Sequence, residues 1–166
     1  MCGGLGLLVV TSIGLSVWTT VRKDGRDGYA WVANSVTPAM WFPNRARKFA
    51  DELRRYVERG KVLTLAPAWP LEAGLSIYPE FATGPFAWRS ARFVSPERRK
   101  RFKLVAPADL ESFLQMDPPA AILTGVEDKE LEGPLLQYAS EHSYRPVKLQ
   151  KQRTLWIPAP AEAKAN

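Results

Sequence analysis

The stretch that decides the fold is Asn44–Ala66, NRARKFADELRRYVERGKVLTLA. Its first part carries apolar residues at the spacing of one helix face: Phe49, Leu53, Tyr56 and Val57. This pattern predicts a helix over residues 44–59, with an Asn as N-cap and a Gly directly after its end. The apolar run KVLTLA that follows is typical of a buried strand over 61–66, so the stretch predicts a helix–strand unit.

The second half of the chain repeats this alternation. The patterns there predict helices over 107–116 and 128–142, strands over 120–124, 144–149 and 153–157, and a turn at 150–152. Alternating helices and short apolar strands are typical of an α/β fold, a small sheet flanked by helices in two or three layers. We therefore expect one soluble α/β domain over residues 44–158, followed by a disordered tail over 159–166.

Composition narrows the chemistry of this domain. The chain has 166 residues and a formal net charge of +6, but only one Cys and one His. A disulfide, a Cys-rich zinc site and a multi-His metal site are therefore excluded within this sequence. We expect no metal and no cofactor, and a nucleophilic triad would depend on His142 alone.

An uncharged run precedes the domain. Residues 3–21, GGLGLLVVTSIGLSVWTTV, would span roughly 28 Å as a helix, close to the thickness of the bilayer core. We expect a transmembrane helix over residues 1–23, preceding the domain, and a linker over 24–43. A signal peptide and a buried element of a soluble core are the two alternatives for this run. The cations at 22, 23 and 26 would by the positive-inside rule keep the domain cytoplasmic.

Residues 67–89, PAWPLEAGLSIYPEFATGPFAWR, directly follow the predicted strand at 61–66. Open α/β sheets carry their ligand sites beyond the carboxyl ends of strands. The prolines and glycines predict an irregular loop, in which Glu72 and Glu80 could act as acids, bases or hydroxyl acceptors. The alternative is a proline-bent loop whose aromatic side chains cover the domain's own core.

This segment contains the motif L-x-P…P-L-E-x-G-L-x-I-Y-P-E…G-P-F-x-W-R. The motif resembles the stretch after the last transmembrane helix of bacterial GT-C superfamily glycosyltransferases, in the group related to protein O-mannosyltransferases. The resemblance implies a soluble C-terminal domain on the periplasmic side of the bacterial inner membrane. It implies membrane lipid, a lipid-linked sugar and the transmembrane part of the same enzyme as partners. The residues that would contact substrate are Glu72, Tyr78, Glu80, Trp88 and Arg89.

The superfamily's catalytic acidic residues lie on a loop between early transmembrane helices, which this chain does not contain. No catalytic residue is therefore predicted, and whether the chain is an enzyme stays open. We expect it to be a C-terminal portion of such a protein or a stand-alone relative.

A basic run, ERRKRFK, occupies residues 97–103 on a short helix predicted to begin at Ser95-Pro96. Its cations could bind phosphate or lipid headgroups: Arg98, Arg99, Lys100 and Arg101. The alternative is a solvated basic helix face. Nucleic acid is not expected as a partner, because no recognition motif accompanies the charge.

Two functions therefore compete. In the first, the chain is the membrane-anchored C-terminal domain of a polyprenyl-phosphate-sugar-dependent glycosyltransferase, supports substrate binding and is inactive alone. In the second, it is a non-enzymatic, membrane-tethered α/β module that binds a protein partner or a saccharide.

Overall fold

The computed structural model describes residue 38 and residues 41–159. The chain divides into two compact units at Arg45, and the second, which begins at Ala46, contains the whole sheet. The described residues form an α/β fold with a five-stranded mixed sheet. Its strands are β1 (Lys61–Leu63), β2 (Ser76–Ile77), β3 (Ala121–Thr124), β4 (Tyr144–Lys148) and β5 (Thr154–Pro158).

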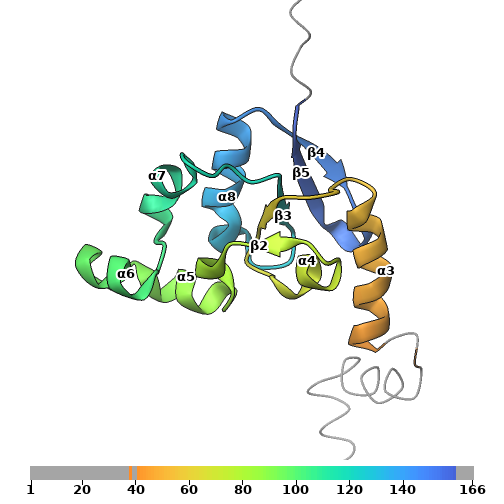
Figure 1. The fold of residues 1–166 in the computed structure, drawn as a ribbon, viewed down its shortest axis with the longest axis horizontal. Helices are drawn as coiled ribbons and strands as arrows, with labels where there is room; N and C mark the ends of the chain where they lie inside the picture. Colours follow the sequence, from red (N-terminus) through yellow and green to blue (C-terminus); the bar gives the residue numbers. More distant parts are fainter. Residues whose placement is uncertain (1–37, 39–40, 160–166) are drawn as a thin grey trace, which may run out of the picture. The chain divides into compact units, whose positions relative to one another are not determined.

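The sheet has the order β2-β1-β3-β5-β4 (Figure 1). Strands β2, β1 and β3 are parallel, and Val62 pairs with both Ile77 and Ala121. Strand β5 runs antiparallel to both β3 and β4. Strand β1 therefore has parallel neighbours on both sides, so the chain leaves it toward one neighbour and later returns to the other. In open sheets a ligand crevice forms at such a reversal of strand order.

The described chain also contains six α-helices. They are α3 (Phe42–Arg54), α4 (Ala68–Glu72), α5 (Pro85–Ala91), α6 (Pro96–Phe102), α7 (Leu110–Leu114) and α8 (Lys129–Glu141). Short 3₁₀ turns occur at η2 (Pro79–Phe81), η3 (Pro107–Asp109) and η4 (Gln150–Gln152).

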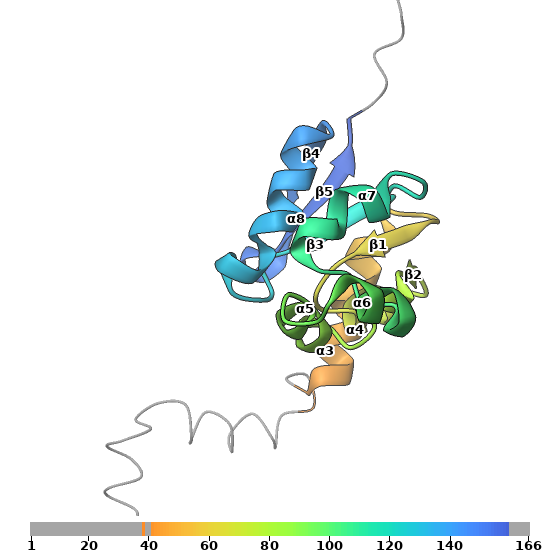
Figure 2. The ribbon, with the colours of Figure 1, turned by 90° about the vertical axis from the view of Figure 1, so that its left-hand side faces the viewer.

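Two hydrophobic cores lie on opposite faces of the sheet, so the domain has three layers. On one face, Leu53 of α3 packs in the same cluster as Val62 and Leu123 of the strands. On the other face, Leu135 of α8 shares a cluster with Ile122. Figures 1 and 2 show α3 and α8 on opposite sides of the strands.

The expected alternation of helices and strands is confirmed over most of the domain. Strand β3, helix α8 and the β4–β5 hairpin lie within one residue of the segments that the sequence predicts, and α6 begins where expected. Helix α3 differs, since it begins at Phe42 and ends at Arg54 instead of covering 44–59. Asn44 therefore lies inside the first turn and is not the N-cap, and its amide Nδ2 donates to the Pro38 carbonyl oxygen at 2.7 Å.

The prediction of an irregular loop over 67–89 is wrong, because the segment contains α4, β2, η2 and most of α5. Its prolines occupy places where a missing N–H costs nothing. Pro79 and Pro85 stand at the start of η2 and α5, and Pro70 lies in the first turn of α4. The prolines therefore begin short helices in this segment instead of preventing them.

The predicted transmembrane helix over 1–23, most of the linker over 24–43 and the tail from 160 lie outside the described residues. None of the helices in the described range combines the length and the apolar character that a bilayer-spanning segment needs.

Candidate functional site

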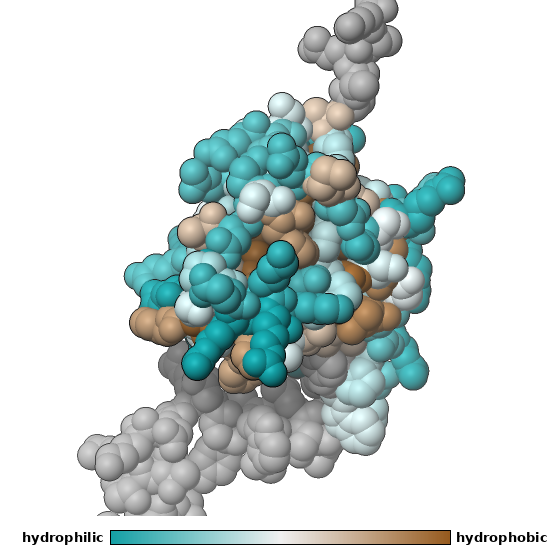
Figure 3. Space-filling model, turned by 60° about the vertical axis from the view of Figure 1, so that its left-hand side comes forward, coloured by the Kyte–Doolittle hydropathy of each residue, from teal (hydrophilic) through white to brown (hydrophobic). Residues whose placement is uncertain are grey.

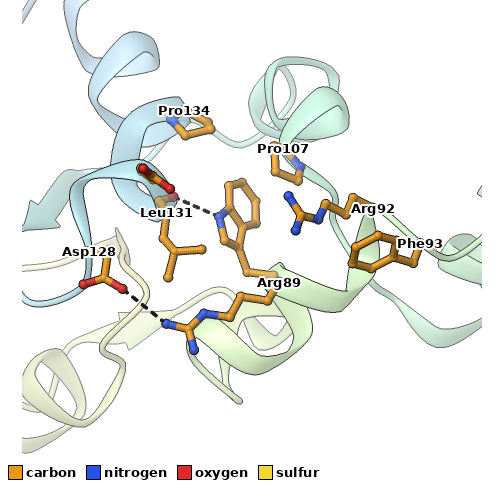
Figure 4. Close-up of a pocket in the computed structure, with 9 residues that line it drawn as sticks. Arg89, Arg92, Phe93, Pro107, Asp128, Leu131 and Pro134 are labelled. Carbon is orange, nitrogen blue, oxygen red and sulfur yellow. Dashed lines mark hydrogen bonds and ion pairs between the residues drawn. The ribbon is translucent and has the colours of Figure 1, made fainter.

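A cleft of about 510 Å³ opens between α5 and the amino-terminal half of α8 (Figure 4). Trp88, Arg89, Arg92 and Phe93 border it on the α5 side, Pro107 lies at the start of η3, and Asp128, Glu130, Leu131 and Pro134 belong to α8 and its N-cap. Because Asp128 follows β3, one wall of the cleft comes from the loop beyond the carboxyl end of that strand. The cleft thus lies on the side of the sheet formed by the carboxyl ends of the parallel strands, where α/β folds carry ligand sites.

Helix α5 is held in place by a glycine and a tryptophan. Gly84 precedes the helix with φ of +63°, and a Cβ there would lie 2.8 Å from the Leu65 carbonyl oxygen. Only glycine fits this close approach without strain. Four residues on, the buried indole of Trp88 donates from Nε1 to the Leu131 carbonyl oxygen of α8 at 3.0 Å. Trp88 therefore joins the two helices that border the cleft.

The loop between β3 and α8 is organised by a buried carboxylate. Glu132 of α8 is 3% exposed, and its side chain accepts from the backbone N–H groups of Gly125, Val126 and Glu127 at 2.6, 3.2 and 3.1 Å. Three converging N–H groups form the kind of concavity that binds anions. Here the protein's own carboxylate fills it, so this loop is a fixed support for the cleft wall and has no room for a ligand anion.

The cleft has a balanced set of charges. Arg89 Nη2 lies 3.8 Å from Glu127 Oε2 and 3.8 Å from Asp128 Oδ2, so this guanidinium is shared between two carboxylates. Arg92 has no carboxylate within ion-pair distance in the described range, and its guanidinium lies 4.7 Å from the centroid of the Phe93 ring. Figure 4 shows Arg92 directed toward the middle of the cleft, beside Pro107. Arg92 therefore offers an anionic group in the cleft a cation that is not already paired with a described carboxylate.

The structure brings two of the five predicted substrate residues to this cleft, Trp88 and Arg89. Glu72 ends α4 and lies 3.7 Å from the Arg47 guanidinium, in a surface ion pair. Glu80 is half-buried in η2. None of the remaining three, which include Tyr78, borders the cleft.

Tyr78 is part of the core. Its side chain is 2% exposed, and its hydroxyl donates to the Asp117 carbonyl oxygen at 2.6 Å. Burial, together with the nearby Asp117 carboxylate, raises the pKa of the phenol well above its usual range. Tyr78 therefore acts as a fixed hydrogen-bond donor between the segment after β2 and the segment before β3.

The four cations of the basic run take two different roles. Arg99 binds Asp109 through Nε at 2.8 Å and Nη2 at 3.2 Å, and its Nη1 donates to the Val94 carbonyl oxygen at 2.6 Å. Arg98, Lys100 and Arg101 are exposed, and none of the described carboxylates lies within ion-pair distance of them. Of the four, only these three are available to bind a phosphate.

Sequence reasoning missed Arg92, Phe93, Asp128 and Glu130. The signal for Arg92 was present, because positions 89 and 92 share one face of a helix, but it required a helix at 85–91 that was not predicted. Asp128 and Glu130 lie at the start of a helix that the sequence did predict. Nothing in the sequence indicated that this helix faces α5.

The cleft presents charged and apolar side chains that are suited to ligand binding. Its lining residues include two guanidinium groups and two carboxylates, with no imidazole or thiol among the described side chains there. No group of three His, Cys, Asp or Glu residues suitable for a metal occurs in the described part of the chain. Comparison with known proteins finds no matching family model, no matching curated protein and no matching solved structure.

Proposed function

We propose that this domain binds the phosphosugar end of a polyprenyl-phosphate sugar in the α5–α8 cleft, as the C-terminal, non-catalytic part of an inner-membrane glycosyltransferase. The observation that carries the proposal is Arg92, a guanidinium directed into an open cleft and lacking a carboxylate partner among the described residues. The sequence motif of residues 65–89, which resembles that of GT-C glycosyltransferases, supports the same assignment.

The cleft matches such a ligand in size and in chemistry. Its volume of about 510 Å³ is in the range of small-molecule sites. Arg92 would bind the phosphate through charge-assisted hydrogen bonds, and Asp128 and Glu130 would accept from sugar hydroxyls. Leu131 and Pro134 provide an apolar wall for the C–H face of the sugar or the first isoprene unit.

In this proposal the domain positions the substrate, and the glycosyl transfer takes place in another part of the enzyme. Arg89, the second guanidinium of the cleft, is shared between Glu127 and Asp128, so it fixes the carboxylate wall. In the resembling superfamily the catalytic acidic residues lie on the first external loop, between early transmembrane helices. The domain would therefore hold the donor or its product and show no transfer activity alone.

The proposal is tested by titrating the full chain, in a mild detergent, with farnesyl phosphate and with a farnesyl phosphoryl hexose. Binding is followed by tryptophan fluorescence, because Trp88 lies in the cleft lining. We expect Arg92→Ala to weaken both ligands on the order of tenfold or more, since a hydrogen bond to a charged group contributes about 1.5–3 kcal/mol. Arg145→Ala is the matched control, an exposed arginine on β4 outside the cleft, and should bind as the unaltered chain does.

A second candidate is favoured by the two carboxylates that border the cleft, Asp128 and Glu130. These are typical hydroxyl acceptors of a saccharide-binding module without any phosphate requirement. Binding of a neutral oligosaccharide that is lost in Asp128→Asn but unchanged in Arg92→Ala would establish this alternative. Equal binding of farnesyl phosphate to Arg92→Ala and to Arg145→Ala would contradict the phosphosugar proposal.

A further inference from the structure

We propose that the exposed face of α5 and α6 is a docking surface for an anionic lipid bilayer. We use the name α5–α6 face for six exposed residues of α5, α6 and the turn between them: Phe86, Phe93, Phe102, Arg98, Lys100 and Arg101. The inference goes beyond the cleft ligand, since it concerns how the domain sits on a membrane. It does not require that the cleft bind any sugar.

The first observation is a group of three exposed phenylalanines. Phe86 is 76% exposed, Phe93 78% and Phe102 59%. These rings come from α5, the turn after it and the end of α6, so they belong to one short segment of chain. A phenylalanine has no polar atom that favours water, and several of them exposed together indicate a surface that is covered in use.

The second observation is that α6 has no part in the core. No residue of this helix is buried within the described structure. Its link to the domain is Arg99, which binds Asp109 and the Val94 carbonyl oxygen. In Figure 1 the helix lies at the periphery, away from the strands. Arg99 thus fixes α6 in place, while its other cations remain at the surface.

The third observation is the charge of α6. The helix carries four cations and one anion, Glu97, and three of the cations have no carboxylate partner within the described range. Lys103 follows directly and is also exposed. Each lysine or arginine near an anionic membrane surface contributes to binding, so the face is complementary to phosphate headgroups.

One cation of this face also lies beside one of its aromatic rings. The guanidinium of Arg101 lies 5.6 Å from the centroid of the Phe102 ring. A ring can then enter the apolar side of the interface while its neighbouring guanidinium binds a headgroup. Figure 3 shows hydrophilic side chains in the foreground of this side of the molecule, with hydrophobic atoms beside and behind them.

The predicted membrane helix favours a bilayer over other polyanions. If residues 3–21 span the membrane, the domain stays within reach of a headgroup layer at high effective concentration. Cations interleaved with aromatic rings could also bind a single-stranded nucleic acid, so the experiment must distinguish the two ligands.

The test uses the full chain, reconstituted in lipid nanodiscs of phosphatidylcholine with or without phosphatidylglycerol. The predicted span would by itself hold the chain in any disc, so the readout is local. Cys2, the only thiol, is replaced by Ser, and an NBD fluorophore is attached after Ser95→Cys, an exposed position at the N-cap of α6. Ser140→Cys, at the far end of α8, is the matched control label.

We expect the label at 95 to gain emission, and to be quenched by spin-labelled lipid, only in discs that contain phosphatidylglycerol. The label at 140 should not respond. Replacing Arg98, Lys100 and Arg101 together by Ala should lower the docking constant roughly a hundredfold. High salt should have a similar effect on the unaltered chain, because exposed charges are screened.

Phe102→Ser should reduce quenching by spin-labelled lipid while docking remains selective for anionic discs. The inference is overturned if the label at 95 responds as the label at 140 does, or responds equally in neutral discs. It is also overturned if a single-stranded oligonucleotide binds the chain and anionic discs do not affect the label. The three-alanine variant leaves the cleft unaltered, so failure here and failure of the phosphosugar proposal can be told apart.

Discussion

Two charged regions of this domain differ in how their charges are satisfied. In the β3–α8 loop, the Glu132 carboxylate is buried and accepts from three backbone N–H groups. On the α5–α6 face, Arg98, Lys100 and Arg101 are exposed and have no carboxylate partner among the described residues. The first region resembles an anion site in which the anion belongs to the protein, whereas the second presents cations to the exterior.

The difference separates residues that maintain the fold from residues left for a ligand. A buried charge is tolerated only when it is paired or hydrogen-bonded. Glu132 and its three N–H partners therefore serve the stability of the fold and not the binding of a ligand. Exposed cations beside exposed phenylalanines contribute little to folding. The adjacent residues Arg98 and Arg99 show both cases within one helix turn, and mutation can test the distinction.

The largest effect is expected for Glu132→Ala. The substitution leaves three backbone donors of the β3–α8 loop without their acceptor, which should lower the free energy of unfolding by about 3 kcal/mol. Urea unfolding of the full chain in mild detergent, followed by circular dichroism, measures this loss. Glu130→Ala, an exposed glutamate on the same helix, should change stability by less than about 0.5 kcal/mol. Equal losses in the two variants would remove the structural role given to Glu132.

A smaller effect is expected for Arg99→Ala, with Arg98→Ala as its neighbouring control. Arg99 makes a two-pronged bond with Asp109 and is 15% exposed, so its loss should cost about 1.5 kcal/mol in the same urea assay. Arg98→Ala should leave stability unchanged and weaken docking on anionic nanodiscs. A reversed result, with Arg98→Ala the more destabilising, would contradict the division between these two arginines.

Tyr78→Phe should cost about 1 kcal/mol at neutral pH, because it removes the hydroxyl's bond to the Asp117 carbonyl. It should not alter binding of farnesyl phosphate, although the sequence suggested a substrate contact for Tyr78. If Tyr78→Phe keeps its stability but loses binding of farnesyl phosphate, Tyr78 contacts the ligand and this prediction is wrong.

Two tyrosines with raised pKa, Tyr78 and Tyr144, set an alkaline limit to stability. Burial raises the pKa of Tyr78, and it raises the pKa of Tyr144 to about 12. An unfolded phenol ionises near pH 10. The stabilisation from these groups is therefore complete below pH 10 and is lost as pH rises from there through the folded pKa. We expect urea midpoints to fall above pH 10, and to fall less steeply in Tyr144→Phe; a fall of equal slope in both would contradict this.

The smallest effect is expected for Glu72→Gln. Its ion pair with Arg47 is 3.7 Å long and solvent-exposed, so the change in unfolding free energy should stay below about 0.5 kcal/mol. Farnesyl phosphate binding should also be unaffected, since Glu72 does not border the cleft. A marked loss of ligand binding in this variant would indicate that the ligand binds near α4 and not in the α5–α8 cleft.

The sequence was sufficient where a local pattern coincides with a buried face. Helix α8 lies within one residue of the predicted segment, and its apolar residues Leu135, Tyr138 and Ala139 are buried. It failed at Pro67–Arg89, because a proline inside a segment looks like a break unless the first turn of each helix is known. It also failed at Glu132, since a glutamate on a helix is expected at the surface until three backbone donors are found around it.

The sequence by itself determined the α/β class, the helix–strand alternation and the location of the basic run, because periodicity and charge are properties of neighbouring residues. Only the tertiary structure decided that α5 and α8 form a cleft, that Arg99 is internally bound while Arg98 is not, and that Tyr78 is a core residue. These facts depend on contacts between residues far apart in the chain, such as Trp88 with Leu131. Local sequence indicates those elements that have a clear periodic pattern, whereas packing determines which of their charges remain for a ligand.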